Sequence, residues 1–134
     1  MAEITVKLRS LPDTAAAVGW SGGHSVTVDR PPGVAGGLGL GFNGGQLLGL
    51  AIGGCFCNDL HYVAAAAGVE LTDLCVDVTL ELSGEPLLAT AAHMSVKATA
   101  AGGADVSAII AKARADSTVS NSLARGFTVD VVAS

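Results

Sequence analysis

Aromatic side chains and charges are both scarce in this chain. Only 4% of its 134 residues are aromatic and only 14% are charged, below the roughly 25% charged residues that are usual in globular domains. Half of the residues are hydrophobic, so aliphatic side chains and glycine must fill the core. We expect a single domain over residues 1–134. Its surplus of apolar side chains favours a homodimer whose interface extends the core.

Basic residues are also few. The chain has 7 Lys and Arg against 12 Asp and Glu, for a net charge of −5. This balance argues against binding to nucleic acid or to anionic membranes. The apolar run over residues 47–57 is interrupted by glycine and is shorter than the about 20 residues of a spanning helix, so no membrane span is expected. The first residues have the pattern of a strand and not of a signal peptide.

The number of cysteines is small and odd, which excludes a disulfide framework. The three are Cys55, Cys57 and Cys75. Reduced thiols in a cytoplasmic protein are the simplest interpretation. Cys57 and His61 are four residues apart and could form half of a metal site, but the other two histidines are not spaced to complete it. We therefore expect no metal and no cofactor.

The hydropathy pattern predicts an α+β domain with the element order βββ-α-ββ-α-β. Alternating apolar and polar residues predict strands around residues 4–8, 18–20, 25–28, 74–82, 88–100 and 127–131. A long helix is expected over residues 46–67, with Asn43 as its cap and Gly68 as its end. Residues 106–113 predict a short amphipathic helix, and residues 119–124 a further helical turn.

Cys55 is predicted to lie on the apolar face of the long helix. The residues that recur at helical spacing on this face are Leu48, Ile52, Cys55, Asp59, Tyr62 and Ala66. Cys57 lies about 200° around the helix from Cys55 and points the opposite way. The glycines at positions 49, 53 and 54 lower helix propensity, which indicates close packing against another backbone, for instance the helix of a second copy.

A glycine-rich segment, Gly39-Leu40-Gly41-Phe42-Asn43-Gly44, precedes this helix. It matches the Gly-x-Gly-x-x-Gly pattern of dinucleotide-binding loops. Such a site also needs a buried parallel strand before the loop, and Pro31-Pro32 interrupts the approach. We interpret the segment as a structural loop that lets the backbone pass close to the core.

Three segments in order resemble motifs of the OsmC/Ohr family. Asn43-Gly44-Gly45-Gln46-Leu47-Leu48 followed by Ala51 and Cys55 is similar to the family's Asn-Pro-x-Glu-Leu-Leu…Ala-x-x-x-Cys motif. Residues 24–37 resemble the segment before that helix, and residues 115–123 resemble the second motif, Cys-Pro-Val-Ser-Asn-x-Leu. The resemblance covers most of the chain and implies an OsmC-like fold, an intertwined homodimer with long central helices packed on antiparallel sheets.

The resemblance also implies thiol-dependent reduction of organic hydroperoxides. It places Cys55 at the attacking position and Ser117 at the position of the resolving cysteine, where serine cannot form a disulfide. The motif's glutamate falls on Gly45 or Gln46, and Arg30 is the better of the two upstream candidates for the activating arginine. Cys57 points away and Cys75 lies on a polar strand face, so neither is an evident resolving thiol.

Two functions remain open from the sequence. The first is a peroxidase of the OsmC family, an oxidative-stress protein that uses Cys55 in a one-cysteine cycle with an external thiol as reductant. The second is a catalytically degenerate dimer of the same fold that binds a small hydrophobic ligand. A purely structural dimer is the weakest alternative, because the helix around Cys55 is chemically rich.

Overall fold

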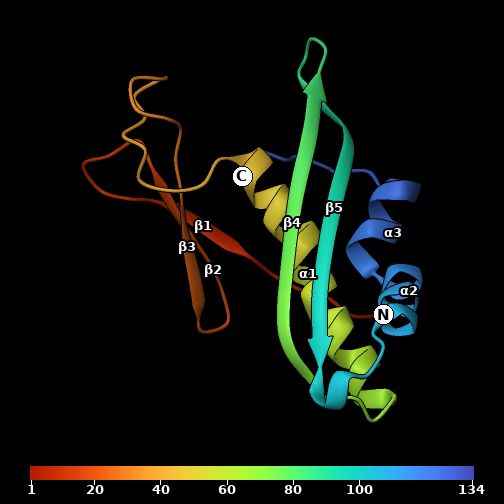
Figure 1. Ribbon diagram of the computed structural model, residues 1–134. Helices are drawn as coiled ribbons and strands as arrows, with labels where there is room; N and C mark the ends of the chain where they lie inside the picture. The colour runs from red at the N-terminus through yellow and green to blue at the C-terminus, as the bar shows by residue number, and fades with distance from the viewer. The chain divides into compact units, whose positions relative to one another are not determined.

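The computed structural model describes all 134 residues and has three helices and five strands (Figure 1). In chain order the elements are β1 (Lys7–Ser10), β2 (Ala17–Ser21), β3 (His24–Val28), α1 (Gly44–Ala66), β4 (Leu71–Ser83), β5 (Leu88–Ala100), a 3-10 turn (Ala101–Gly103), α2 (Ser107–Asp116) and α3 (Thr118–Arg125). They group into an N-terminal unit, Met1–Leu48, and a C-terminal unit, Gly49–Ser134, with the boundary inside α1.

The N-terminal unit contains an antiparallel sheet in the order β1-β2-β3. The strands are short and the register runs from Lys7 opposite Trp20 to Ser21 opposite His24. The turn between β2 and β3 uses Gly22 at a φ of 58°, a left-handed conformation that glycine adopts without steric cost. The three predicted strands are therefore present, although β1 begins at Lys7, three residues after the predicted start.

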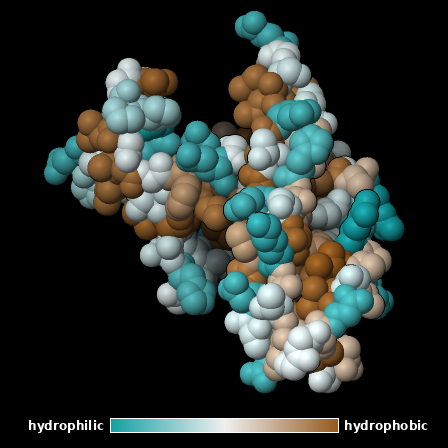
Figure 2. Space-filling model, in the orientation of Figure 1, coloured by the Kyte–Doolittle hydropathy of each residue, from teal (hydrophilic) through white to brown (hydrophobic).

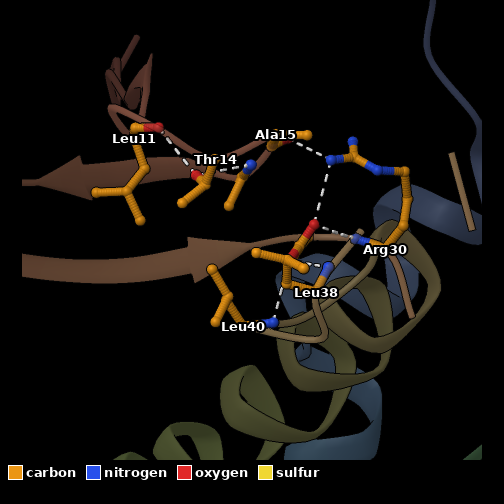
Figure 3. A network of polar contacts seen from close by, with 8 residues as sticks. Leu11, Thr14, Ala15, Arg30, Leu38 and Leu40 are labelled. Atoms are coloured by element: carbon orange, nitrogen blue, oxygen red, sulfur yellow. Dashed lines mark hydrogen bonds and ion pairs between the residues drawn. The ribbon is translucent and has the colours of Figure 1, made fainter. Parts of the chain in front are cut away.

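A buried carboxylate organises the loop after β3 (Figure 3). Asp29 accepts hydrogen bonds from the backbone N–H groups of Leu40 at 3.0 Å, Leu38 at 3.1 Å and Arg30 at 2.8 Å. The hydrogen bond from Leu40 is the largest of the effects that hold the pKa of Asp29 below its ordinary value of 3.8. The bonds from Leu38 and Arg30 and the charge of Arg30 act in the same direction, whereas burial opposes the shift. One side chain thus accepts from three backbone N–H groups of this irregular loop, which adds to the backbone hydrogen bonds within the loop itself.

The glycine-rich segment passes so close to β3 that no side chain would fit at position 41. A Cβ atom on Gly41 would lie 2.0 Å from the carbonyl oxygen of Thr27. Phe42 donates to that same oxygen at 3.0 Å and forms an isolated parallel bridge with Val28. Because β3 is a strand of an antiparallel sheet, the β-α-β arrangement of a dinucleotide fold is not formed.

Helix α1 begins and ends as its sequence predicts. The Gln46 N–H donates to the Asn43 side chain at 2.9 Å, and the Asn43 N–H donates back to the Gln46 side chain at 3.0 Å, a reciprocal capping box. At the other end Gly68 has a φ of 70°, and Val69 donates to the Ala64 carbonyl at 2.9 Å in a Schellman closure. With 23 residues the helix is longer than the apolar run of the sequence, and by length and composition alone it would suit a membrane span.

Helix α1 packs as the core helix of the C-terminal unit. Its buried residues in that unit are Ile52, Gly53, Phe56, Leu60 and Ala64. Phe56, Leu60 and Ala64 lie against the antiparallel hairpin of β4 and β5, whose half-buried side chains alternate with polar ones, and against Ile109 and Ala113 of α2. Leu60 is fully buried at the centre of this cluster. The strands β4 and β5, with 13 residues each, and the two C-terminal helices match the predicted elements.

The buried face of α1 differs from the predicted one by about one residue. It centres on Phe56 and Leu60, whereas Cys55 is half-buried at its border and Tyr62 is 73% exposed. The prediction followed the recurrence of Ile52, Cys55 and Asp59, but the larger Phe56 side chain buries more apolar area and sets the rotation of the helix. A Cβ on Gly53 would lie 3.0 Å from Val78 of β4, so this glycine packs on the hairpin rather than on a second helix.

The predicted last strand is not formed in the single chain. Residues 126–134 follow α3 without regular secondary structure, and Phe127, Val129 and Val131 are 74%, 78% and 89% exposed. The alternating pattern is that of a strand, but a strand requires a neighbouring strand to satisfy its N–H and C=O groups. The tail has no such partner within the chain.

Candidate functional site

The sulfur of Cys55 lies at the border of the α1 core face, where it is partly accessible. One helical turn further on, Asp59 presents its carboxylate 3.6 Å from that sulfur. The four-residue spacing places the two side chains on the same side of the helix. The thiol can therefore donate its proton to Asp59 in a hydrogen bond.

The second contact of Cys55 comes from a distant part of the chain. Ser117 is the single residue between α2 and α3, and its side chain is fully buried. Its hydroxyl donates to the Cys55 sulfur at 3.8 Å across a sequence separation of 62 residues. The Ser117 backbone is extended, with a φ of −61° and a ψ of 116°, and its carbonyl accepts the N–H of Asn121 at the start of α3. The break between the two helices thus aims the hydroxyl at the thiol.

The three side chains form a hydrogen-bonded row from Ser117 to Cys55 to Asp59. The hydroxyl donates a hydrogen bond to the sulfur, and the carboxylate is an acceptor for the thiol proton. Oxidised sulfur at position 55 would face a hydroxyl and not a second thiol. The row can support nucleophilic chemistry at Cys55, but it cannot close an internal disulfide there.

The other two cysteines form no hydrogen bond with this row. Cys57 is half-buried on α1, and Cys75 is exposed on the polar face of the hairpin, opposite Lys97. No group of three or more His, Cys, Asp or Glu side chains is close enough to hold a metal ion.

Arg30, the third residue that the sequence suggests, lies in the N-terminal unit. Its guanidinium pairs with the Asp29 carboxylate at 3.1 Å and also donates to the Ala15 carbonyl (Figure 3). Gln46, at the position of the motif's glutamate, is engaged in the capping box of α1. The structure thus brings Cys55 and Ser117 together, while Arg30 is held by its own loop and its role stays a prediction.

Sequence reasoning did not assign a role to Asp59. The signal was its position four residues after Cys55, which places a carboxylate next to the thiol on any regular helix. The helical spacing alone predicts that Asp59 shares an apolar face with Cys55. The structure shows instead that the carboxylate and the thiol form a polar edge beside that face.

The central helix on an antiparallel hairpin and the cysteine that faces the α2–α3 junction define a protein of the OsmC-like fold class. The OsmC family model, described as OsmC-like protein, matches residues 36–132. The chain therefore belongs to the OsmC-like protein family. A comparison with curated proteins gave no match.

Several solved structures share this fold. An OsmC-like protein of unknown function from Vibrio cholerae has a TM-score of 0.78 at 11% identity, with 91% of this chain and 94% of that chain covered. The organic hydroperoxide resistance protein OsmC from Legionella pneumophila has a TM-score of 0.63 at 19% identity, with 92% and 90% covered. The organic hydroperoxide resistance protein OhrB of Bacillus subtilis has a TM-score of 0.57 at 17% identity, with 90% of each chain covered.

Proposed function

We propose that the protein reduces organic hydroperoxides in a one-cysteine cycle, with Cys55 as the attacking thiol. The observation that carries the proposal is the position of the Cys55 sulfur, half-exposed and 3.8 Å from the buried Ser117 hydroxyl. Family membership and the names of the Legionella and Bacillus neighbours support a role in peroxide stress. The row of Ser117, Cys55 and Asp59 provides a nucleophilic thiol, a hydroxyl donor and a carboxylate acceptor.

The first step transfers one oxygen atom from the peroxide to sulfur. The Cys55 thiolate attacks the outer oxygen of R–O–O–H, so that a sulfur–oxygen bond forms and the O–O bond breaks. The leaving alkoxide takes a proton and departs as the alcohol, and Cys55 is left as a sulfenic acid. Asp59, as acceptor of the thiol proton, is positioned to return that proton to the alkoxide.

The second step requires a thiol from outside the chain, because Ser117 occupies the place of a resolving cysteine. An external thiol attacks the sulfenic sulfur, which releases water and leaves a mixed disulfide on Cys55. A second external thiol then attacks the mixed disulfide and restores Cys55. The sum is one hydroperoxide and two thiols converted to one alcohol, one water and one disulfide.

Mass spectrometry of the intact protein tests this cycle. One equivalent of an alkyl hydroperoxide should add one oxygen atom to the wild-type chain, and a small thiol should remove it. Cys55→Ser should abolish the addition, whereas Cys57→Ser and Cys75→Ser serve as matched controls and should leave it unchanged. Wild-type protein that stays reduced at Cys55 would refute the proposed function.

Arg30 is the residue that we propose to assist the Cys55 thiolate. Asp29 and the Ala15 carbonyl already hold its guanidinium in a fixed orientation. Arg30→Lys keeps the charge but loses the planar fork, so it should slow oxidation of Cys55 less than Arg30→Gln does. Equal rates of oxidation in the wild type and both variants would remove Arg30 from the proposal.

A second candidate function is binding of a small hydrophobic ligand by a catalytically degenerate member of the family. The serine at position 117 and the absence of the motif's glutamate favour it. This alternative predicts saturable binding of apolar ligands that persists in Cys55→Ser. Oxidation of Cys55 and ligand binding are measured separately, so the two functions can be distinguished.

We further propose that the protein acts as a cytoplasmic homodimer. All three cysteines are free, as expected in a reducing compartment. Apolar side chains are exposed at both ends of the chain, among them Ile4 at 88% and Val131 at 89%. A second copy would cover them and would offer the strand partner that the tail lacks. Analytical ultracentrifugation should give twice the chain mass, and removal of residues 127–134 should weaken the association.

A further inference from the structure

A cavity of about 620 Å³ opens in the C-terminal unit, and Cys55 is not among the residues that line it. Its apolar wall consists of Phe56 of α1, Met94 and Val96 of β5, and Ile110 of α2. Arg114 of α2, Ser120 of α3 and His93 of β5 contribute polar groups to the lining, and His93 is already paired with Glu81 at 3.3 Å. Figure 2 shows apolar surface between β5 and α2, flanked by hydrophilic side chains. The volume lies in the range of about 300–1,000 Å³ that small-molecule sites occupy.

The cation in this cavity has no anionic partner. Arg114 forms no ion pair, whereas Lys112 on the same helix pairs with Asp116 at 3.0 Å. Arg114 is exposed and shares this lack of an ion pair with Lys7, Arg9, Lys97 and Arg125, but it is the only one of these five cations that lines the cavity. A guanidinium has five N–H donors in a fork that matches the two oxygens of a carboxylate.

We propose that this cavity binds a small amphiphilic carboxylic acid, with the carboxylate on Arg114 and the aliphatic chain along Phe56, Met94 and Ile110. An apolar ligand without a charge would leave the guanidinium unpaired, and a small inorganic anion would leave the apolar wall in water. A medium-chain fatty acid satisfies both parts of the site. Ser120, which also lines the cavity, has a hydroxyl that can act as a further donor.

This inference deepens the second candidate function, because it gives that function a site and a ligand class. It rests on ligand binding by this fold and not on the reactivity of Cys55. Cys55→Ser should therefore bind the acid as the wild type does. Failure of peroxide reduction would leave the inference intact, and failure of acid binding would leave the peroxidase proposal intact.

Methionine methyl signals in NMR provide a sharp test. The chain has two methionines, of which Met94 lines the cavity and Met1 is fully exposed. Titration of the full-length protein, labelled with carbon-13 at the methionine methyl groups, with decanoate below its micelle concentration should shift the Met94 signal saturably. The Met1 signal should not move and serves as the internal control. Methyl decanoate, which lacks the charge, should bind at least ~10-fold more weakly.

Variants separate the two halves of the site. Arg114→Gln should weaken decanoate binding at least ~10-fold and abolish the preference over the ester, because it removes a charge-assisted bond. Lys112→Gln is the matched control on the same helix and should change little. Ala92→Phe places bulk in the cavity from an exposed position on β5 and should block both probes. Equal affinity for acid and ester, an Arg114→Gln variant that binds like the wild type, or a Met94 signal that never shifts would overturn the proposal.

Discussion

Replacing Ser117 with cysteine should restore the disulfide that the site cannot form. The Ser117 hydroxyl is 3.8 Å from the Cys55 sulfur and is its donor partner. A disulfide needs the two sulfur atoms at about 2.05 Å, so the pair must approach by roughly 1.8 Å. Ser117 is the single residue between two short helices, and small shifts of that junction can supply this approach. We expect one equivalent of hydroperoxide to link positions 55 and 117 by a disulfide in the Ser117→Cys variant.

The sequence separation of 62 residues sets the size of the expected stabilisation. A cross-link over a loop of that length removes about 4 kcal/mol of chain entropy from the unfolded state. Sulfur is larger than oxygen, and because Ser117 is fully buried the reduced variant should lose about 1–3 kcal/mol through overpacking. The oxidised variant should therefore melt roughly 10–15 °C above its own reduced form.

Two measurements check this prediction. Intact mass after hydroperoxide treatment should show the loss of two hydrogen atoms in Ser117→Cys, where the wild type gains one oxygen atom. Thermal unfolding of the oxidised and reduced variant should show the difference in melting temperature. Ser120→Cys, whose side chain lines the cavity and has no hydrogen bond with Cys55, is the matched control and should gain oxygen instead. A Ser117→Cys variant that gains oxygen without a disulfide would refute the proposed geometry.

Three further predictions concern the fold. Leu60→Ala should lower the free energy of unfolding by about 2–5 kcal/mol in a urea titration, because Leu60 is fully buried; a loss below about 1 kcal/mol, the cost of a surface change, would contradict the packing. Gly54→Ala should raise the free energy of unfolding by about 0.4–1 kcal/mol, because the added Cβ meets open space. Gly53→Ala should be the less stable variant of the pair, because its Cβ lies 3.0 Å from Val78. Equal stabilities of the two variants would contradict the contact of α1 with β4. Backbone hydrogen bonds hold the pKa of Asp29 below 3.8, so its stabilising effect is complete above about pH 5 and is lost as the pH falls through the folded-state pKa. Asp29→Asn should therefore melt lower at pH 7 and lose part of its acid sensitivity, and an unchanged pH profile of the melting temperature would contradict this assignment.

Most elements of the fold could be predicted because their signals are local. Alternation indicated the strands, Asn43 and Gly68 marked the limits of α1, and both are seen in its capping box and Schellman closure. The rotation of α1 could not be predicted with the same accuracy. Adjacent helix positions differ by only about 100°, and the choice between Cys55 and Phe56 as the buried position depends on the shape of the hairpin that receives them.

The site could be predicted only where a motif or a spacing marked it. Cys55 and Ser117 are 62 residues apart, and only the family resemblance suggested that they meet. The contact of Arg114 with the cavity has no sequence signal, because the wall combines β5, α2 and α3 with α1, which lies much earlier in the chain. At the C-terminus the reverse holds: the alternating pattern clearly predicts a strand, but the chain contains no strand that pairs with it.

The unpaired tail after α3 has a thermodynamic consequence. If residues 127–131 become ordered only when a second molecule supplies the neighbouring strand, folding and association are one reaction of second order in protein. The melting temperature would then rise with concentration, and dilution alone would expose the tail to proteases. The amount of protein in the cell, rather than the sequence by itself, would set the fraction of chains whose Phe127 and Val129 are covered.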